Sequence, residues 1–209
     1  MKEIQERILR EKVIGIIRLK DDSKLMEVVA AIIAGGINLI EITLNTPNAF
    51  EHIVNIKEQY PGVCVGAGTV LGDENARNAI EAGAEFLVSP VCEVDVIEAA
   101  SENDVVVITG SLTPNEIYEA HLHGVNFVKP FPMTGLGPAY IKALLAPMPF
   151  LRLIPTNGVT LDNMKEFFEA GVKAVGLGTP LVSENDAANG RFAEIEQRAK
   201  SAVDIVRSL

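Results

Sequence analysis

Short apolar segments and longer amphipathic segments alternate along the whole chain. Most of the apolar segments are hydrophobic at successive positions, which is typical of parallel strands that are covered on both faces. They start on average about 23 residues apart, a spacing that suits one strand, one helix and two short loops. The eight predicted strands are Val13–Arg18, Ile37–Leu44, Val63–Gly68, Glu85–Ser89, Val105–Thr109, Val125–Lys129, Leu151–Pro155 and Ala174–Gly178.

The segments between these strands carry helix signals. Thr113-Pro114-Asn115-Glu116 combines a capping box with a proline at the first helical position, and Thr46 followed by Pro47 predicts another helix start. Gly83, Gly124 and Gly171 each follow a helical pattern, at the position where a helix is expected to end.

Eight β/α repeats without a break favour a closed (β/α)₈ TIM barrel over an open doubly wound sheet. The charged, amphipathic start of the chain, residues 1–12, predicts an extra helix that plugs or flanks the bottom of the barrel. A length of 209 residues suits one full hydrophobic core. We therefore expect a single barrel domain over residues 1–209.

Composition narrows the classes of function. Hydrophobic residues make up 48% of the chain and charged residues 22%, with no apolar run long enough to predict a membrane span. The N-terminal segment does not resemble a secretory signal, and Cys64 and Cys92 are expected to be reduced thiols in a cytoplasmic protein. The net charge of −10 argues against a nucleic-acid partner, so an anionic substrate would need a local binding site.

Barrel enzymes collect their chemistry at the carboxyl ends of the strands. Lys129 ends the sixth predicted strand, between Val-Asn-Phe-Val and Pro-Phe-Pro. Burial in such apolar surroundings would lower the pKa of its amine, and a neutral amine is the form that attacks carbonyl groups. The alternative is a lysine whose end reaches solvent. Position alone leaves both possibilities open.

Glu41 lies in a strand that is otherwise apolar, Ile-Asn-Leu-Ile-Glu-Ile-Thr-Leu-Asn. If Ile40 and Ile42 point outward beneath the helices, Glu41 points into the barrel. An inward carboxylate is costly unless it is paired or catalytic. It could move protons for Lys129, or it could form a structural ion pair.

The last two predicted strands end in small and polar residues. Thr156-Asn157-Gly158 and Gly178-Thr179 occupy the positions where barrels often bind phosphate, although ordinary strand-to-helix turns would look the same. No His, Asp, Glu or Cys residues have the spacing of metal ligands, which favours a metal-free mechanism. Ser89 and Ser111 have no histidine nearby in the sequence to activate them as nucleophiles.

Several ordered motifs resemble, from end to end, the family of 2-keto-3-deoxy-6-phosphogluconate aldolase and 4-hydroxy-2-oxoglutarate aldolase. The matching segments are Glu41-Ile42-Thr43-Leu44, residues 65–71 (Val-Gly-Ala-Gly-Thr-Val-Leu), Ser89-Pro90, Lys129 with Phe131-Pro132, Gly137-Pro138 before Ile141-Lys142-Ala143, Pro155-Thr156 with Gly158-Val159, and Gly176-Leu177-Gly178.

The resemblance implies a class I aldolase, a carbon–carbon lyase that acts on a small-molecule 2-keto acid. Lys129 would form the Schiff base and Glu41 would be the general acid and base, with no metal or other cofactor. The family is commonly homotrimeric. The expected substrate-binding residues are Arg18, Thr43, Asn45, Thr69, Pro90 and Thr156, with Thr69 at the pyruvate portion, and the expected phosphate-binding residues are Asn157, Gly158, Gly178 and Thr179.

Two departures from the family pattern bear on the substrate. Asn45 stands where many members carry an arginine that holds the substrate carboxylate, so Arg18 is expected to take over that role. Asn157 stands where the phosphate loop usually has glycine. The pair of Arg18 and Asn45 resembles enzymes for the galactonate epimer, whereas Thr156 resembles those for the gluconate epimer.

The expected reaction is cleavage of a 2-keto-3-deoxy-6-phospho sugar acid, of gluconate or galactonate type, to pyruvate and glyceraldehyde 3-phosphate. The first alternative is the same lysine chemistry on an unphosphorylated acid such as 4-hydroxy-2-oxoglutarate. Two others are a phosphosugar isomerase or epimerase that uses Glu41 alone, and a sugar-phosphate binder without catalysis.

Overall fold

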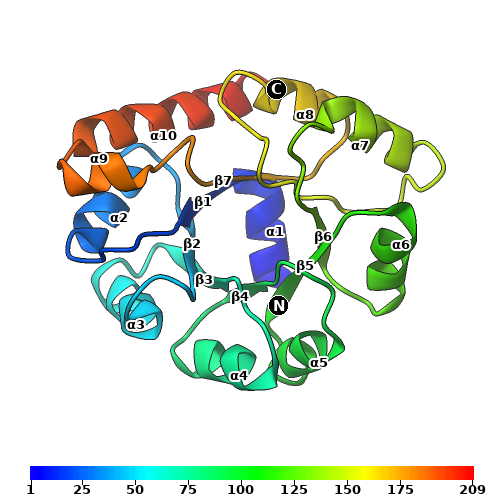
Figure 1. Ribbon diagram of the computed structural model, residues 1–209, viewed down its shortest axis with the longest axis horizontal. Coiled ribbons are helices and arrows are strands. Elements are labelled where there is room, and N and C mark those ends of the chain that lie inside the picture. The colour runs from blue at the N-terminus through cyan, green and yellow to red at the C-terminus, as the bar shows by residue number, and fades with distance from the viewer.

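The computed structural model describes residues 1–209 and contains a curled, fully parallel β-sheet ringed by helices (Figure 1). Seven strands follow one another in the order β6-β5-β4-β3-β2-β1-β7. Their bounds are β1 Val13–Ile17, β2 Leu39–Thr43, β3 Cys64–Gly68, β4 Phe86–Val88, β5 Val106–Ser111, β6 Phe127–Pro130 and β7 Val175–Leu177.

The segment expected to be the seventh of eight strands, residues 151–155, closes the ring between β6 and β7. On one side Leu153 forms a parallel bridge to Val128, whose carbonyl accepts a hydrogen bond from the Ile154 N–H. On the other side Lys173 N–H donates to Leu153 and Gly176 N–H donates to Pro155. The pairing is too sparse to make a regular strand, since Pro155 has no N–H to donate. The molecule is therefore a (β/α)₈-type barrel.

Helices α2 to α10 surround the ring, and α2 to α8 lie between strands in the usual β/α order, whereas α1 precedes β1 and α9 and α10 follow β7 (Figure 1). The long last helix, α10, packs beside α2 close to the seam where β7 meets β1. The helices are α1 Lys2–Glu11, α2 Leu25–Ala34, α3 Ala49–Gln59, α4 Asp73–Glu81, α5 Val94–Glu102, α6 Pro114–Leu122, α7 Gly137–Leu145, α8 Met164–Glu169, α9 Glu184–Ala188 and α10 Phe192–Arg207.

Alternate residues of most strands belong to two separate hydrophobic clusters. On β2, Leu39 lies in the small cluster inside the barrel, whereas Ile40 and Ile42 lie in the large cluster between the sheet and the helices. Side chains on a strand point to opposite faces in turn, so Glu41 points into the barrel. The strands are covered on both faces, as their continuous hydrophobicity predicts.

Helix α1 closes the amino-terminal end of the barrel, as expected for an extra N-terminal helix. Its Ile8 is fully buried in the inner cluster. Arg7 donates hydrogen bonds to the carbonyls of Asn38 and Gly62, which precede β2 and β3. The opposite end of the barrel, where the strands finish, therefore remains available for a site.

The helix signals had different outcomes. The capping box is confirmed, because the Thr113 side chain accepts from the Glu116 N–H and the Glu116 side chain accepts from the Thr113 N–H. The helix start at Thr46-Pro47 is wrong. Helix α3 begins at Ala49, and the Thr46 hydroxyl is buried, where it accepts a hydrogen bond from the Leu19 N–H and contacts the Thr43 hydroxyl.

The three glycines predicted to end helices do so. Gly83, Gly124 and Gly171 all have positive φ, between 77° and 106°, which lets the chain reverse with no penalty from a side chain.

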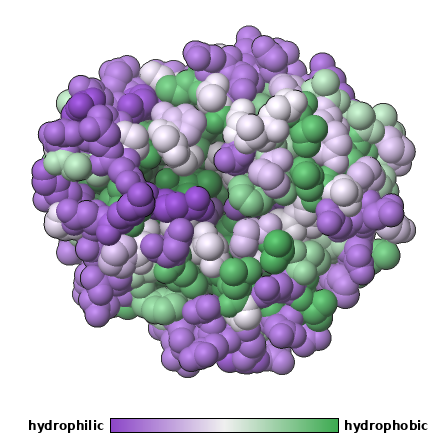
Figure 2. Space-filling view, viewed as in Figure 1, coloured by the Kyte–Doolittle hydropathy of each residue, from purple (hydrophilic) through white to green (hydrophobic).

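Hydrophilic residues dominate the outer rim of the barrel in the view down its short axis, whereas hydrophobic ones are more frequent toward the middle (Figure 2). Measured by length and hydropathy, none of the ten helices would cross a membrane.

Candidate active site

A cavity of about 540 Å³ opens at the carboxyl ends of β1, β2, β6 and β7. Eight residues expected at the site line it together, although they come from five separate segments of the chain. They are Arg18, Glu41, Lys129, Thr156, Asn157, Gly158, Gly178 and Thr179. Closure of the sheet brings these segments together, because parallel strands in a barrel all end at one rim.

Lys129 is buried at the cavity, with 5% of its surface exposed, and does not extend to solvent. Its amine forms no ion pair within the protein, and its Nζ lies 4.6 Å from the centre of the Phe131 ring. Burial lowers the pKa of the amine. The carboxylate of Glu41 raises it in part, and the nearby positive charge of Arg18 lowers it further. The site thus favours the neutral, nucleophilic form.

Glu41 is 2% exposed and also lines the cavity. It makes neither a hydrogen bond nor an ion pair, so the alternative of a structural ion pair with Lys129 or Arg18 does not hold. Burial raises the pKa of its carboxyl group, while the charges of Lys129 and Arg18 lower it. A carboxyl group with a raised pKa and no fixed partner can both accept and return a proton.

A glycine on the neighbouring strand makes room for this carboxylate. A Cβ atom at Gly68 of β3 would lie only 1.9 Å from Glu41 Oε1. On the other side of the cavity, a Cβ at Gly176 would lie 2.5 Å from the Thr156 side chain. The two glycines therefore shape the site through the side chains they admit.

Thr156 is 5% exposed, and its hydroxyl is buried without a hydrogen-bond partner. Leaving such a group unpaired costs free energy, which a bound ligand could recover. The next residue, Asn157, has a positive φ of 55°, and its side-chain oxygen accepts a hydrogen bond from the Thr134 hydroxyl. This contact ties the loop after residues 151–155 to the loop after β6.

Four of the expected substrate-binding residues lie outside the cavity lining. The Thr43 hydroxyl is buried and donates to the Ile17 carbonyl, and Asn45 is exposed after the end of β2. Thr69, with a φ of 58°, and Pro90 follow β3 and β4, on the part of the rim away from β7.

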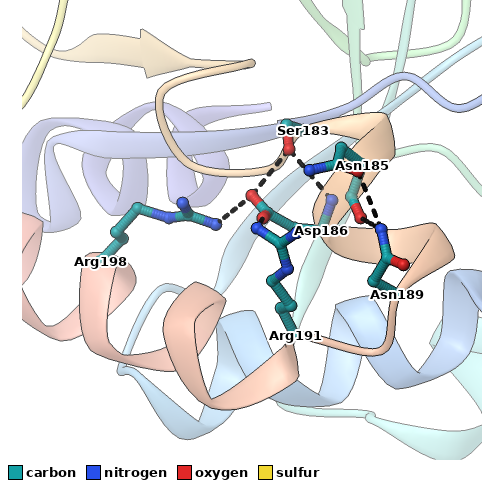
Figure 3. A network of polar contacts seen from close by, with 6 residues as sticks. All are labelled: Ser183, Asn185, Asp186, Asn189, Arg191 and Arg198. Atoms are coloured by element: carbon teal, nitrogen blue, oxygen red, sulfur yellow. Dashed lines mark hydrogen bonds and ion pairs between the residues drawn. The ribbon is translucent and has the colours of Figure 1, made fainter.

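The lining also includes residues that the sequence reasoning missed. Phe131 follows Lys129, and the others are Ile16, Val159, Pro180, Val182, Ser183, Glu184 and Asn185. Most of these belong to the segment that runs from β7 into the first turn of α9, beyond the strand ends that were searched. The pattern Ser183-x-x-Asp186 is a helix-start signal that could have placed this turn, and Ser183 is indeed the N-cap of α9 (Figure 3).

No group of three His, Cys, Asp or Glu side chains in the structure is arranged to hold a metal ion. The ionisable residues of the cavity are Arg18, Lys129, Glu41 and Glu184. The charges of Lys129 and Glu41 act on each other's pKa, and the charge of Arg18 acts on both, whereas Glu184 stands at the start of α9.

Comparison with known proteins identifies the family. The family model for KDPG and KHG aldolase matches residues 4–198. The chain belongs to this aldolase family. It is therefore a carbon–carbon lyase of the KDPG aldolase type.

Curated members of the aldolase family match over nearly their whole length. The 2-dehydro-3-deoxy-phosphogluconate aldolase of Pseudomonas aeruginosa is 32% identical over 92% of this chain and 88% of its own. The 2-dehydro-3-deoxy-6-phosphogalactonate aldolase of Escherichia coli K12 is 30% identical, over 93% of each chain.

A solved structure of the same family shows its chemistry. KDPG aldolase from Legionella pneumophila, captured with pyruvate as a covalent carbinolamine, superposes with a TM-score of 0.87 at 27% identity, covering 95% of this chain and 97% of the other.

Members of the aldolase family named for the two sugar epimers align with this chain at about the same level of identity.

Proposed function

We propose that this aldolase acts through a Schiff base on Lys129, with Glu41 as the general acid and base. The observation that carries the proposal is the buried, unpaired Lys129 amine, which shares a cavity with a buried, unpaired carboxylate. The opposite pKa shifts of the two groups both favour their neutral forms, and each can change its protonation state during a reaction.

The proposed cleavage proceeds in balanced steps. The neutral amine adds to the C2 carbonyl of the 2-keto acid to form a carbinolamine. Its hydroxyl takes a proton from Glu41 and leaves as water, which gives a positively charged iminium and the carboxylate of Glu41. Glu41, directly or through a water molecule, removes the proton of the C4 hydroxyl. The C3–C4 bond breaks, its electron pair passes into the iminium to form an enamine, and the aldehyde leaves. Glu41 returns the proton to C3, and water then releases pyruvate from Lys129.

For the substrate we propose a 2-keto-3-deoxy-6-phospho sugar acid, which would give pyruvate and glyceraldehyde 3-phosphate. The names of the relatives support this class for both the gluconate and galactonate epimers. The proposed phosphate contacts are Asn157, Gly158, Gly178 and Thr179, with Arg18 and Thr156 on the carboxylate and hydroxyl groups. Thr43, Asn45, Thr69 and Pro90 remain proposed contacts at the other side of the rim.

A second candidate substrate is an unphosphorylated acid of the 4-hydroxy-2-oxoglutarate type. Two observations favour it. The Asn157 side chain stands in the proposed phosphate loop, and Glu184 brings a negative charge to the same cavity. Comparing kcat/KM for phosphorylated and unphosphorylated acids separates the two candidates.

The remaining parts of the proposal concern the whole protein. We propose that residues 1–209 form one domain that acts in the cytoplasm as a homotrimer and needs no metal, since the iminium on Lys129 serves as the electron sink. Light scattering in solution tests the trimer, and activity after treatment with a chelator tests the independence from metal.

The central experiment is borohydride reduction in the presence of pyruvate. We expect a three-carbon fragment on the peptide that contains Lys129, and none on the peptide of the exposed Lys142. The Lys129→Met variant should lose both the adduct and turnover. Absence of an adduct in the wild type would refute the mechanism, and substantial activity in Lys129→Met would favour an isomerase or epimerase. Binding of sugar phosphates without any turnover would favour a non-catalytic binder.

A further inference from the structure

One side of the cavity is formed by the chain that runs from β7 into α9. We call residues 179–185 the outer wall. Five of its residues besides Thr179 line the cavity, namely Pro180, Val182, Ser183, Glu184 and Asn185. None of the seven residues belongs to a strand. Leu181 and Val182 are anchored in the core between the sheet and the helices, whereas Glu184 and Asn185 are exposed and Ser183 is half-buried, so these three depend on contacts outside the core.

Side chains behind the outer wall hold its polar members in place (Figure 3). The Ser183 hydroxyl donates to Asp186 Oδ2 at 2.7 Å and accepts from the Asp186 N–H at 3.1 Å. The Asn185 side-chain oxygen accepts from Asn189 at 2.8 Å, and the Glu184 carboxylate lies 3.8 Å from the Lys20 amine.

Asp186 is the only one of these supporting groups that is buried, with 7% of its side chain exposed. It receives a hydrogen bond at 2.7 Å from Arg198 of α10 and a longer one at 3.4 Å from Arg191. Burial acts to raise the pKa of its carboxyl group, but the hydrogen bonds from Ser183 and Arg198 outweigh burial and hold the pKa below its ordinary value. The carboxylate therefore stays charged and links the wall to α10.

Helix α10 is a firm support for this link. It packs closely on α2, where a Cβ at Gly35 would lie 2.4 Å from Ala199, one residue beyond Arg198. Asp186 itself is not part of the cavity lining and contacts neither Lys129 nor Glu41. Its influence on a ligand must pass through Ser183 and the residues on either side of it.

We propose that Asp186 is a positioning residue that fixes the outer wall, so that the wall can hold the end of the substrate that leaves as the aldehyde. Pyruvate chemistry at Lys129 does not depend on it. The inference rests on the proposed function, because it divides the substrate into a pyruvate portion at the buried lysine and a tail that reaches the wall.

The test separates the two portions of the substrate. The test uses two variants, Asp186→Asn and Arg198→Gln, and in both the altered side chain lies outside the cavity. We expect both variants to form the borohydride adduct with pyruvate at the wild-type rate. The KM for the full substrate should rise about tenfold in both, with kcat little changed, because a small displacement of a binding group is costly. The wild type is first assayed with the two phosphorylated epimers and with 4-hydroxy-2-oxoglutarate. The acid that it cleaves fastest is then the substrate for the variants.

The control is Arg77→Gln, which removes an exposed arginine that pairs with Asp73 and Glu102 on α4 and α5. It should leave both readouts unchanged. The Arg198→Lys variant should recover part of the KM that Arg198→Gln loses.

Equal losses of adduct formation and cleavage in Asp186→Asn would mean a general loss of folding and would overturn the inference. So would a KM equal to that of the wild type in both variants. Failure of the wild type to form the pyruvate adduct, or to cleave any of the three acids, would instead refute the proposed function and the inference with it.

Discussion

At the scale of single residues, the site depends on two buried ionisable groups that the fold leaves without protein partners. Burial shifts the pKa of Lys129 downward and that of Glu41 upward, so both shifts favour the uncharged forms. Each group also opposes the other's shift, because the charged forms attract one another. This mutual influence can be measured.

The Glu41→Gln variant should lower the pKa of Lys129 further. The carboxylate of Glu41 favours the protonated amine, so its removal leaves burial and the charge of Arg18 less opposed. We expect the rate of pyruvate adduct formation to rise with pH in the wild type, with a midpoint below the ordinary lysine value of 10.5. In Glu41→Gln the midpoint should move to lower pH. A midpoint that stays in place or moves upward would contradict this account.

Residue types at strand ends predicted three of the four ionisable residues that line the cavity, because a barrel brings all strand ends to one rim. Lys129, Glu41 and Arg18 were found in this way. Ser183, Glu184 and Asn185 were not, since they follow β7 by several residues and reach the cavity only through the turn into α9. Asn45 and Thr69 were expected at the site, but the sequence cannot say how far the rim extends between β2 and β4.

At the scale of elements, strand β3 shows how two glycines of one strand serve different purposes. Their Cβ atoms would meet different neighbours. At Gly66 the neighbour is the ring of Phe86 in the inner core, 2.4 Å away, and at Gly68 it is the carboxylate of Glu41. Gly66 therefore makes room for the core, and Gly68 makes room for the carboxylate of Glu41.

The variants Gly66→Ala and Gly68→Ala test whether the two glycines make room for different neighbours. Gly66→Ala should cost about 1–3 kcal/mol of unfolding free energy, because it overpacks the core. Gly68→Ala should lower kcat about a hundredfold by displacing Glu41, while the pyruvate adduct on Lys129 still forms. Urea unfolding and steady-state kinetics measure the two effects. A Gly68→Ala enzyme with wild-type kcat would show that the position of Glu41 is not critical.

Local sequence signals predicted helix starts best where the side chains in the signal bond to each other's backbone. The Thr113 capping box satisfied two backbone N–H groups, as expected. Thr46 carried a similar signal, but a tertiary contact with Leu19 took its hydroxyl. Residues 151–155 were recognised as strand-like from hydrophobicity, and only the structure shows that they pair through a few hydrogen bonds.

At the scale of the whole molecule, the closing helix α1 and the cavity lie at opposite ends of the barrel. Helix α1 closes the amino-terminal end through Ile8, and the cavity opens where the strands finish. Changes at one end should therefore leave the other unaffected, provided that the barrel stays folded.

Ile8→Ala tests this separation. It removes a fully buried side chain and should lower the unfolding free energy by about 2–5 kcal/mol, as measured in urea. Well below the unfolding transition, kcat and KM should match those of the wild type. A changed KM in folded Ile8→Ala protein would mean that the two ends are coupled.

Closure of the ring also sets an order of assembly for the chain as it emerges from the ribosome. One edge of β1 pairs only with β7, which begins at Val175, and the pocket that receives Ile8 includes Phe127, Ile154 and Ala174. Helix α1 therefore gains its complete binding surface only after Ala174 and β7 have been synthesised. Until then its apolar face and the open strand edge beside it are the surfaces most exposed to premature association.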